Sequence, residues 1–461
     1  MKEELSGRFV RLILIRMMKG VRVMSSTKEE KVVSVEEAVA VIKSHDVIVS
    51  AMAAAEPREI VKHLHTIAHR VENVTVTTCL PFEPADYFNK VAYKDAFKMD
   101  GWFYTGTMRK AQANGTMSFI PNHLHLAGTK RLSHQKPNVF IGTASHPDEH
   151  GYVSLSLSNV YEKQMVEAAD TVILEINKNF PRTFGDLELH LSEIDYLVET
   201  DYEVPELPNL EPNAKDRKIG ALIAGKINDG DCLQLGIGGI PNAVAYALMD
   251  KKDLGIHTEM FTTGLMELVK AGVATGKKKQ IQKGKHVAAF AMGTKALYEF
   301  INNNPSVAIL DGNWTNDPYT ISQNDNQVSI NTTIEIDLTG QCASETIGHI
   351  QYSWTGGQAD TAIGAQKSRH GRSFIALYST ALVMNTKTGK REEISKIVPF
   401  LKPGATVSLS RNDVDHVVTE YGIAELRGTS VRERVERLIA IAHPKFQAEL
   451  LEEAKQLGYI V

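Results

Sequence analysis

The chain has 461 residues, of which 43% are hydrophobic and 23% charged, and it carries a formal net charge of -4 at pH 7. This length is too great for one compact core and predicts an ordinary globular protein of two or more domains. The weak negative charge argues against nucleic acid or an anionic membrane as a partner. Because no apolar run reaches the roughly 20 residues of a membrane helix, we also expect no membrane span.

Three cysteines, Cys79, Cys232 and Cys342, lie far apart in the sequence. None forms a CxxC pair, so their spacing indicates neither a disulfide framework nor a structural zinc site. We therefore expect a reducing, cytoplasmic setting.

The opening segment 9–18 superficially has the pattern of a signal peptide, because basic residues precede an apolar stretch. Arg11 and Arg16 interrupt that stretch, and no small-residue cleavage site follows it. Regular globular patterning begins near Val32, so residues 1–30 are expected to be an N-terminal extension outside the fold.

The same order of elements is predicted twice along the chain. In the first copy a capped helix, an apolar strand, a small-residue loop and a second helix are expected at 34–42, 47–50, 51–57 and 58–69. In the second copy the corresponding elements are expected at 219–226, 231–235, 236–241 and from 242 onward. Pro57 and Pro241 hold the same place in the two copies, and Pro241 is expected at the first position of its helix. The repetition predicts a duplicated α/β domain.

Further apolar strands are expected in both halves, at 74–78, 139–142, 171–176, 287–292, 307–310 and, as a half-buried strand ending at Gly340, 334–340. Apolar strands that alternate with helices predict parallel-rich sheets buried on both faces. The segment 204–212 carries three prolines and is predicted to be a linker without regular structure. We therefore expect two similar tandem α/β domains, 31–203 and 213–461, with a site between them.

Several nucleotide and hydrolase chemistries do not fit the glycine-rich segment 236–241. A dinucleotide-binding turn requires three glycines, but Pro241 follows Gly236 and Gly238 where the third is needed. A P-loop lysine does not follow the turn, and the sequence has no G-x-S-x-G motif for a serine hydrolase.

The histidine pairs do not predict a metal site. His146 and His150 have helical spacing, but Pro147 opposes the continuous helix that would align them. Two further pairs have strand-type spacing and no nearby carboxylate set in the sequence, His63 with His65 and His123 with His125. We therefore expect no metal.

Glu259 is the candidate nucleophile. It lies between Gly255, expected to be flexible, and Gly264, expected to act as a hinge, soon after the glycine-rich turn. A lone Glu is ordinarily a solvated surface carboxylate. A nucleophilic carboxylate suits thioester exchange, and the Gly356-Gly357 pair can direct N–H groups at an oxyanion, although a tight turn would also explain that pair.

Several segments together resemble the acetyl-CoA hydrolase/transferase family, and within it the 4-hydroxybutyrate and butyryl-CoA:acetate CoA-transferase branch. The resemblance extends from about residue 30 and is strongest from 213 to 450. The segments that carry it are 236–241, 257–261, 337–341, 356–360, 417–428 and 441–444. It implies the CoA-transferase (NagB/RpiA-like) fold, coenzyme A as part of an acyl-CoA substrate, small carboxylates as the other substrates, and a homo-oligomer.

The resemblance also implies residue roles. Glu259 matches the glutamate that forms a glutamyl-CoA thioester in a ping-pong reaction. The implied CoA contacts are Gly236, Ile237, Gly238, Gly239, Ile240, Ile334 and Gly357.

The substrate remains open among several acids. Relatives usually carry glycine in the loop that corresponds to 51–57, whereas this chain has none there and places Met52 beside the expected acyl site. Gly356 and Gln358 are further substrate-site candidates. The acid is expected to be of the 4-hydroxybutyrate, butyrate or acetate type.

Three other functions remain possible from the sequence. The first is a dicarboxylate transferase, for itaconate or succinate, in which Lys367, Arg369 or Arg372 would meet the second carboxylate. The second is an acyl-CoA hydrolase. The third is a non-catalytic CoA-binding protein.

Overall fold

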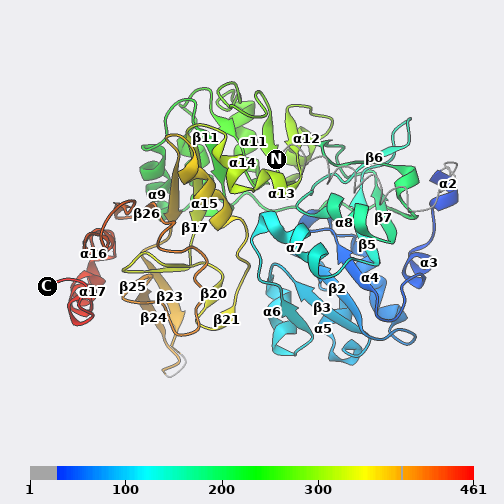
Figure 1. Cartoon of the computed structure of the whole chain (residues 1–461), viewed down its shortest axis with the longest axis horizontal. Helices are drawn as coiled ribbons and strands as arrows, with labels where there is room; N and C mark the ends of the chain where they lie inside the picture. The colour runs from blue at the N-terminus through cyan, green and yellow to red at the C-terminus, as the bar shows by residue number, and fades with distance from the viewer. Residues whose placement is uncertain (1–27, 386–387) are drawn as a thin grey trace, which may run out of the picture.

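The computed structural model describes residues 28–385 and 388–461, and most of the expected extension 1–30 lies outside these residues. Two halves lie side by side, each built around a parallel-rich sheet (Figure 1). This arrangement confirms the predicted fold class. The short helix α2 (Lys28–Lys31) precedes the first half.

The first half contains a sheet of seven parallel strands. In spatial order the strands are β10 (Tyr196–Thr200), β7 (Thr171–Asn177), β5 (Val139–Ala144), β1 (Val47–Ser50), β2 (Val74–Thr78), β3 (Phe97–Gly101) and β4 (Met117–Phe119). The strands predicted at 47–50 and 74–78 coincide with β1 and β2. Their β-branched, apolar sequences suit a sheet that is covered on both faces.

Helices cover both faces of this sheet. One face packs against α3 (Val35–Ala40), α4 (Arg58–His63), α5 (Asp86–Asn89) and α6 (Gly106–Ala113), and the other against α7 (Ala127–His134) and α8 (Glu162–Ala168). The predicted N-cap is confirmed, because the Glu37 N–H donates to Ser34 Oγ at 3.2 Å and the Ser34 N–H donates to Glu37 Oε2 at 2.8 Å. The helix predicted at 58–69 is shorter, since a 3-10 helix (Leu64–Ile67) follows α4.

The second half contains a six-stranded sheet in which only the last pair is antiparallel. Its strands are β12 (Gly255–Ile256), β11 (Cys232–Leu235), β17 (Gln327–Thr332), β22 (Arg372–Ala376), β26 (His416–Thr419) and β27 (Gly422–Glu425). Its helices are α9 (Ala214–Ala224), α10 (Gly239–Ala247), α11 (Thr263–Lys270), α12 (Lys295–Ile301), α13 (Gly312–Thr315), α14 (Pro318–Ser322), α15 (Gln358–Lys367), α16 (Val431–Ala440) and α17 (Pro444–Gln456).

The prediction that Pro241 is the first residue of its helix is wrong. Helix α10 starts at Gly239, with Gly238 as its N-cap. Pro241 is therefore the third helical residue. A proline is tolerated there because the first four N–H groups of a helix have no intrahelical acceptor.

The strand predicted at 287–292 is interrupted. It forms β14 (His286–Ala288) and β15 (Phe290–Ala291), which join different small sheets. β15 pairs with β13 (Met260–Phe261), while β14 pairs with β16 (Val307–Ile309), which also pairs with β8 (Phe184–Gly185) of the first half. A sheet is thus shared between the halves.

The segment 334–340 is not the predicted half-buried strand. It forms a buried hairpin of β18 (Glu335–Asp337) and β19 (Cys342–Ala343), and β25 (Ile397–Val398) pairs on the other side of β18. The Asp337 carboxylate accepts the Thr339 and Gln341 N–H groups, both at 2.9 Å, so its polar side chain is satisfied inside the turn. Three two-stranded ribbons complete the fold: β6 (Tyr152–Ser154) with β9 (Glu188–His190), β20 (Thr346–Ile347) with β21 (Ile350–Gln351), and β23 (Thr380–Met384) with β24 (Arg391–Ser395).

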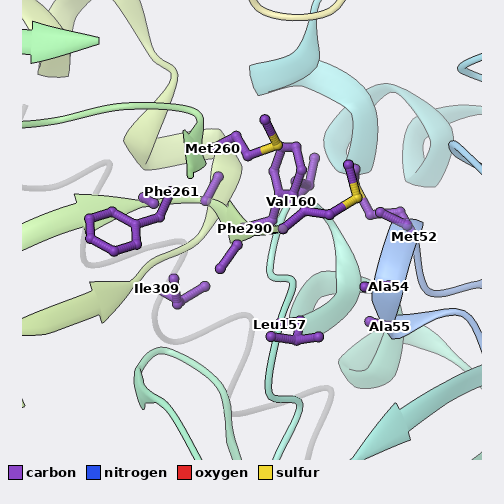
Figure 2. Packing of buried hydrophobic residues seen from close by; sticks show 14 of the residues in the cluster. Met52, Ala54, Ala55, Leu157, Val160, Met260, Phe261, Phe290 and Ile309 are labelled. Atoms are coloured by element: carbon purple, nitrogen blue, oxygen red, sulfur yellow. The ribbon is translucent and has the colours of Figure 1, made fainter. Parts of the chain in front are cut away.

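One buried hydrophobic cluster contains residues from both halves, including Phe140 of β5 and Leu233 of β11. Figure 2 shows part of this cluster, in which Met52 of the first half and Met260 of the second lie close to Val160. Residues 204–212 contain no helix or strand, although Val204 is buried in the same cluster. The chain therefore packs continuously between its halves.

Candidate active site

Glu259 lies in the short connection between β12 and β13, where the chain leaves the carboxyl edge of the second sheet. Its backbone carbonyl accepts the N–H groups of Ala289 and Phe290, at 2.9 and 3.1 Å. These two bonds occur where β14 ends and β15 begins, so the interruption of the predicted strand holds the Glu259 backbone. The Glu259 side chain is half-buried.

Two hydrogen-bond donors meet the Glu259 carboxylate. Asn316 Nδ2 donates to Glu259 Oε2 at 2.9 Å, and the Gly357 N–H also donates to the carboxylate. A Cβ atom at Gly357 would lie 1.9 Å from Glu259 Oε2 and 2.3 Å from Asn316 Nδ2, so only glycine fits. Gly357 therefore lies at the Glu259 carboxylate. Asn316, which the sequence does not single out, supplies the second donor.

The surroundings raise the pKa of Glu259 from 4.5 to about 7. The main cause is burial, which penalises the charged form, and the charge of Asp360 acts in the same direction. The hydrogen bonds from Asn316 and Gly357 oppose this rise because they favour the carboxylate. A carboxyl group with a pKa near neutrality can be ionised and nucleophilic at physiological pH.

Asp360 connects this site to the first half of the chain. Its buried carboxylate accepts the His125 N–H at 3.1 Å and lies 2.8 Å from His125 Nδ1, while His123 Nδ1 is 3.9 Å away. The sequence gives no sign of this contact, because Asp360 lies 235 residues after His125. The Leu124 N–H also donates to the Gly356 carbonyl at 3.2 Å, so both halves contribute to the surroundings of Glu259.

The glycine-rich loop lies at the same sheet edge. Leu233 pairs with Ile256, and the next residues of both strands lead to Gly236 and Glu259. Gly238 has a φ of +109°, which favours glycine, and nothing lies within 4 Å of the place where its Cβ would be. The turn also exposes the first N–H groups of α10, an arrangement suited to a phosphate.

The other loop residues have distinct surroundings. A Cβ at Gly239 would lie 2.4 Å from Asp216 Oδ2, so this glycine allows close packing on α9. Gly236 donates its N–H to the Ile330 carbonyl at 3.1 Å and is thereby unavailable to an oxyanion. Ile237 is 46% exposed, whereas Ile240 is buried.

Gln358 and Ile334 lie beside the same edge. Gln358 is buried, its Oε1 accepts Ser344 Oγ–H at 2.7 Å and its Nε2 donates to the Thr332 carbonyl at 2.7 Å. Both ends of this amide are thus bound to protein. Ile334 is half-buried and leads into β18.

Met52 lies in a buried loop of the first half that contacts Cys79 and Glu162. Met52 is buried, and its N–H donates to Glu162 Oε1 at 3.0 Å. Ala53 has a φ of +53°, a conformation that favours glycine, and its N–H donates to the Cys79 carbonyl at 3.2 Å. Burial and the nearby charges of Glu162 and Glu259 raise the pKa of the Cys79 thiol, so this loop lies near Glu259.

The basic residues proposed to meet a second carboxylate lie elsewhere. α15 runs from the neighbourhood of Gly357 to Lys367, and ten helical residues span about 15 Å. Beyond it, Arg369 pairs with Asp325, and Arg372 donates to Asp231 Oδ2 at 2.5 Å at the amino edge of the sheet. The expectation that these residues meet a second carboxylate is wrong, because Glu259 lies at the opposite edge.

The glycines that flank Glu259 serve packing rather than flexibility. Gly255 lies in β12, where a Cβ would be 2.7 Å from Lys279 Cγ. Gly264 lies inside α11, where a Cβ would be 3.2 Å from Ala245 Cβ. The expected hinge at Gly264 is therefore wrong.

Residues 28–385 and 388–461 contain neither a candidate metal site nor a candidate membrane span. In this part of the chain, no three His, Cys, Asp or Glu side chains are grouped so that they could hold a metal ion. Among the same residues, every helix is too short or too polar to cross a bilayer.

Two halves built on parallel-rich sheets have the architecture of a CoA-transferase. The chain belongs to the acetyl-CoA hydrolase/transferase family, whose N-terminal domain matches residues 18–208 and whose C-terminal domain matches residues 293–454.

Relatives support this assignment over nearly the whole chain. Succinyl-CoA:cyclohexane-1-carboxylate CoA transferase of Geobacter metallireducens is 42% identical over 94% of this chain and 96% of its own length. The 4-hydroxybutyrate coenzyme A transferase of Clostridium kluyveri is 42% identical over 93% and 98%. The crystal structure of RipA from Yersinia pestis superposes with a TM-score of 0.87 at 35% identity and covers 94% of this chain and 99% of RipA.

Proposed function

We propose that this enzyme moves CoA between short carboxylic acids by ping-pong chemistry in which Glu259 becomes a glutamyl-CoA thioester. The observation that carries the proposal is the pair of donors, Asn316 Nδ2 and the Gly357 N–H, on a half-buried carboxylate whose pKa is raised to about 7. A Cβ at Gly357 would lie 1.9 Å from Glu259 Oε2, so the absence of a side chain at Gly357 lets its backbone approach the carboxylate. A carboxyl carbon that becomes tetrahedral needs such donors held in place.

The reaction requires four steps. The Glu259 carboxylate attacks the thioester carbonyl of the acyl-CoA, which releases CoA thiolate and leaves a mixed anhydride. The thiolate attacks the Glu259 carbonyl carbon, which releases the first acid and forms the glutamyl-CoA thioester. A second carboxylate attacks this thioester, and the released thiolate then attacks the acyl carbon of the new anhydride, which frees Glu259 and forms the second acyl-CoA.

Asn316 and Gly357 have a direct role in this scheme. When the Glu259 carbonyl becomes tetrahedral, negative charge develops on the oxygen that they contact. Donors preorganised at a developing oxyanion stabilise the transition state without reorganisation. The N–H groups at the start of α10, with Ile237, Ile240 and Ile334, would bind parts of CoA beside this centre.

The acids that exchange CoA are also part of the proposal. Relatives named for 4-hydroxybutyrate and for butyrate and acetate support short monocarboxylates, and Met52 would border the acyl group. Relatives named for succinyl-CoA support a dicarboxylate such as succinate or itaconate as the second candidate. Because the basic residues after α15 lie at the far edge, a second carboxylate would have to meet other groups. His123 and His125, which contact Asp360, are candidates.

The proposal includes three statements about the protein as a whole. Residues 31–203 and 213–461 form the two domains, joined by 204–212. A homo-oligomer is supported by Leu382 and Met384, which are 68% and 58% exposed on the β23–β24 ribbon. The enzyme acts in the cytoplasm, where the reduced, buried cysteines are stable.

Mass spectrometry of the intact protein and its peptides tests the mechanism. After incubation with acetyl-CoA or succinyl-CoA, we expect a CoA-sized, borohydride-sensitive adduct on the peptide that contains Glu259. Glu259→Gln should form no adduct, while the matched control Glu267→Gln, on neighbouring α11, should form it normally. Adduct on another residue, or none from any acyl-CoA while CoA still binds, would refute the mechanism and favour a CoA-binding protein.

A second assay identifies the reaction and its acids. The kcat/KM values for acetate, butyrate, 4-hydroxybutyrate, succinate and itaconate as acceptors should be highest for one of the monocarboxylates. A dicarboxylate with the highest value would establish the second candidate. CoA release that needs no acceptor acid, at the rate seen with one, would identify a hydrolase.

A further inference from the structure

We infer that His257 is a positioning residue, which holds Asn316 in place on the Glu259 carboxylate through the backbone carbonyl of Thr315. The inference rests on the proposed role of Glu259 as the nucleophile. It assigns a task to a buried histidine that lies two residues before Glu259 in the chain.

The hydrogen bonds of His257 define one tautomer. His257 is 1% exposed, its Nε2 lies 2.7 Å from the Thr315 carbonyl oxygen, and its Nδ1 lies 3.4 Å from Asn324 Nδ2. A carbonyl oxygen only accepts and an amide nitrogen only donates, so Nε2 carries the proton and Nδ1 accepts. The neutral ring therefore donates a short hydrogen bond to the backbone of α13.

This bond acts where α13 ends. Thr315 is the last residue of α13, and Asn316 caps the helix and donates to Glu259 Oε2 at 2.9 Å. Asn316 is buried, and its Oδ1 has no hydrogen-bond partner among residues 28–385 and 388–461. Within this part of the chain the Asn316 side chain hydrogen-bonds only to Glu259, so its position depends on how the backbone before it is held.

The first half of the chain fixes the other end of α13. The Gly312 N–H donates to the Asn159 carbonyl at 2.8 Å, and a Cβ at Gly312 would lie 2.6 Å from the Val160 carbonyl oxygen. Asn313 Nδ2 donates to the His125 carbonyl at 2.7 Å. A helix of one turn has little rigidity of its own, so its position is set by these contacts at its start and by His257 at its end.

His257 itself is held firmly. Its N–H donates to the Leu233 carbonyl at 3.0 Å, and its carbonyl accepts Gln327 Nε2 at 3.2 Å. The segment that carries the nucleophile is thus fixed to two strands of the sheet, and the same segment holds the helix that carries the donor. The distance between the Asn316 and Glu259 side chains is therefore fixed, because the segment that carries Glu259 also holds the helix before Asn316.

Steady-state kinetics of His257→Leu test the inference. Loss of the Nε2–H donor should lower kcat by about 10- to 100-fold, as is typical for supporting hydrogen bonds, with little change in KM for the acyl-CoA. His257→Gln, whose amide can donate to the same carbonyl, should recover a large part of kcat. An unchanged kcat in folded His257→Leu would overturn the inference.

A matched control separates this role from packing. His286 is also buried and lies on neighbouring β14, and its Nδ1 has no partner in the part of the chain that the structure describes. His286→Leu should change the melting temperature about as much as His257→Leu but leave kcat near that of the wild type. Equal losses of kcat in both variants would show that burial, rather than the bond to α13, matters.

A double-mutant cycle with Asn316→Ala provides a readout that a purely structural role would not move. If His257 acts through Asn316, His257→Leu should lower kcat much less in the Asn316→Ala background than in the wild type. Additive losses would overturn the inference even if both single variants are slow. The wild-type adduct on Glu259 is measured first, because its absence would refute the proposed function independently of the His257 result.

Discussion

Replacement of Glu259 by Gln should stabilise the protein at alkaline pH. The raised pKa means that the folded protein binds a proton at Glu259 more tightly than the unfolded chain does. Stability therefore falls as the pH rises from 4.5 to about 7, and the full cost of the buried charge is present above that window. Glu259→Gln removes the charge and keeps the shape of the side chain.

The size of the effect follows from the shift in pKa. A shift from 4.5 to about 7 corresponds to about 3 kcal/mol. Glu259 is half-buried, so solvent screening reduces this to about 2 kcal/mol above pH 8. For a chain of 461 residues, 2 kcal/mol corresponds to an increase of about 2 °C in melting temperature, and at pH 5 the increase should be less than half as large.

Thermal melts of the wild type and of Glu259→Gln at pH 5 and pH 8.5 provide the assay. Glu267→Gln on α11 is the control, because its side chain is 39% exposed and lies 3.8 Å from Lys270 at the surface. The reasoning is refuted if Glu259→Gln melts at or below the wild-type temperature at pH 8.5, or if its gain is as large at pH 5.

Three further predictions concern the same site. The rate of adduct formation should rise with pH through a midpoint near 7, because the nucleophile is the carboxylate of Glu259, and a flat profile from pH 5 to 8 would contradict this. Gly357→Ala should lower the rate of adduct formation by at least about 100-fold, because the new Cβ would displace Glu259 and Asn316. Rapid-mixing measurements that compare this variant with Gly356→Ala distinguish the effect from a general effect on the loop. Asp360→Asn should move the pH midpoint downward, because it removes a charge that raises the Glu259 pKa, and an upward shift would show that the lost contact with His125 dominates.

The fold could be predicted wherever a local pattern decided the structure. Apolar β-branched runs gave β1 and β2 their observed bounds, and the capping pattern at Ser34 located α3. The prediction failed at 287–292, because the apolar run gives no sign that two N–H groups turn toward the Glu259 carbonyl. It also failed at 334–340, where the polar residues of an apparent half-buried strand are satisfied inside a turn.

The candidate site could be predicted only in part, for a related reason. Glu259, Gly357 and the glycine turn belong to local motifs with recognisable spacing. Asn316 and Asp360 act through contacts with residues far away in the sequence, and an isolated Asn or Asp carries no signal of that kind. The two-residue spacing between His123 and His125 is a weak signal of a site. It does not identify the carboxylate partner of His125, because that partner, Asp360, lies on α15 of the other half.

The hydrogen-bond donors around Glu259 have two opposing effects on its reactivity. A hydrogen bond to the carboxylate favours its ionised form but also makes it a weaker nucleophile, so Asn316 and Gly357 accelerate the reaction only if they bind the tetrahedral oxygen more strongly than the carboxylate. Burial supplies the opposing effect, since it raises the Glu259 pKa to about 7 despite both donors. In the proposed mechanism the Glu259 carboxylate is therefore ionised near neutral pH but poorly solvated, and its donors already lie where negative charge develops in the tetrahedral intermediate. The contacts that fix α13 at both ends would then affect the rate rather than substrate binding, because they keep these donors in place.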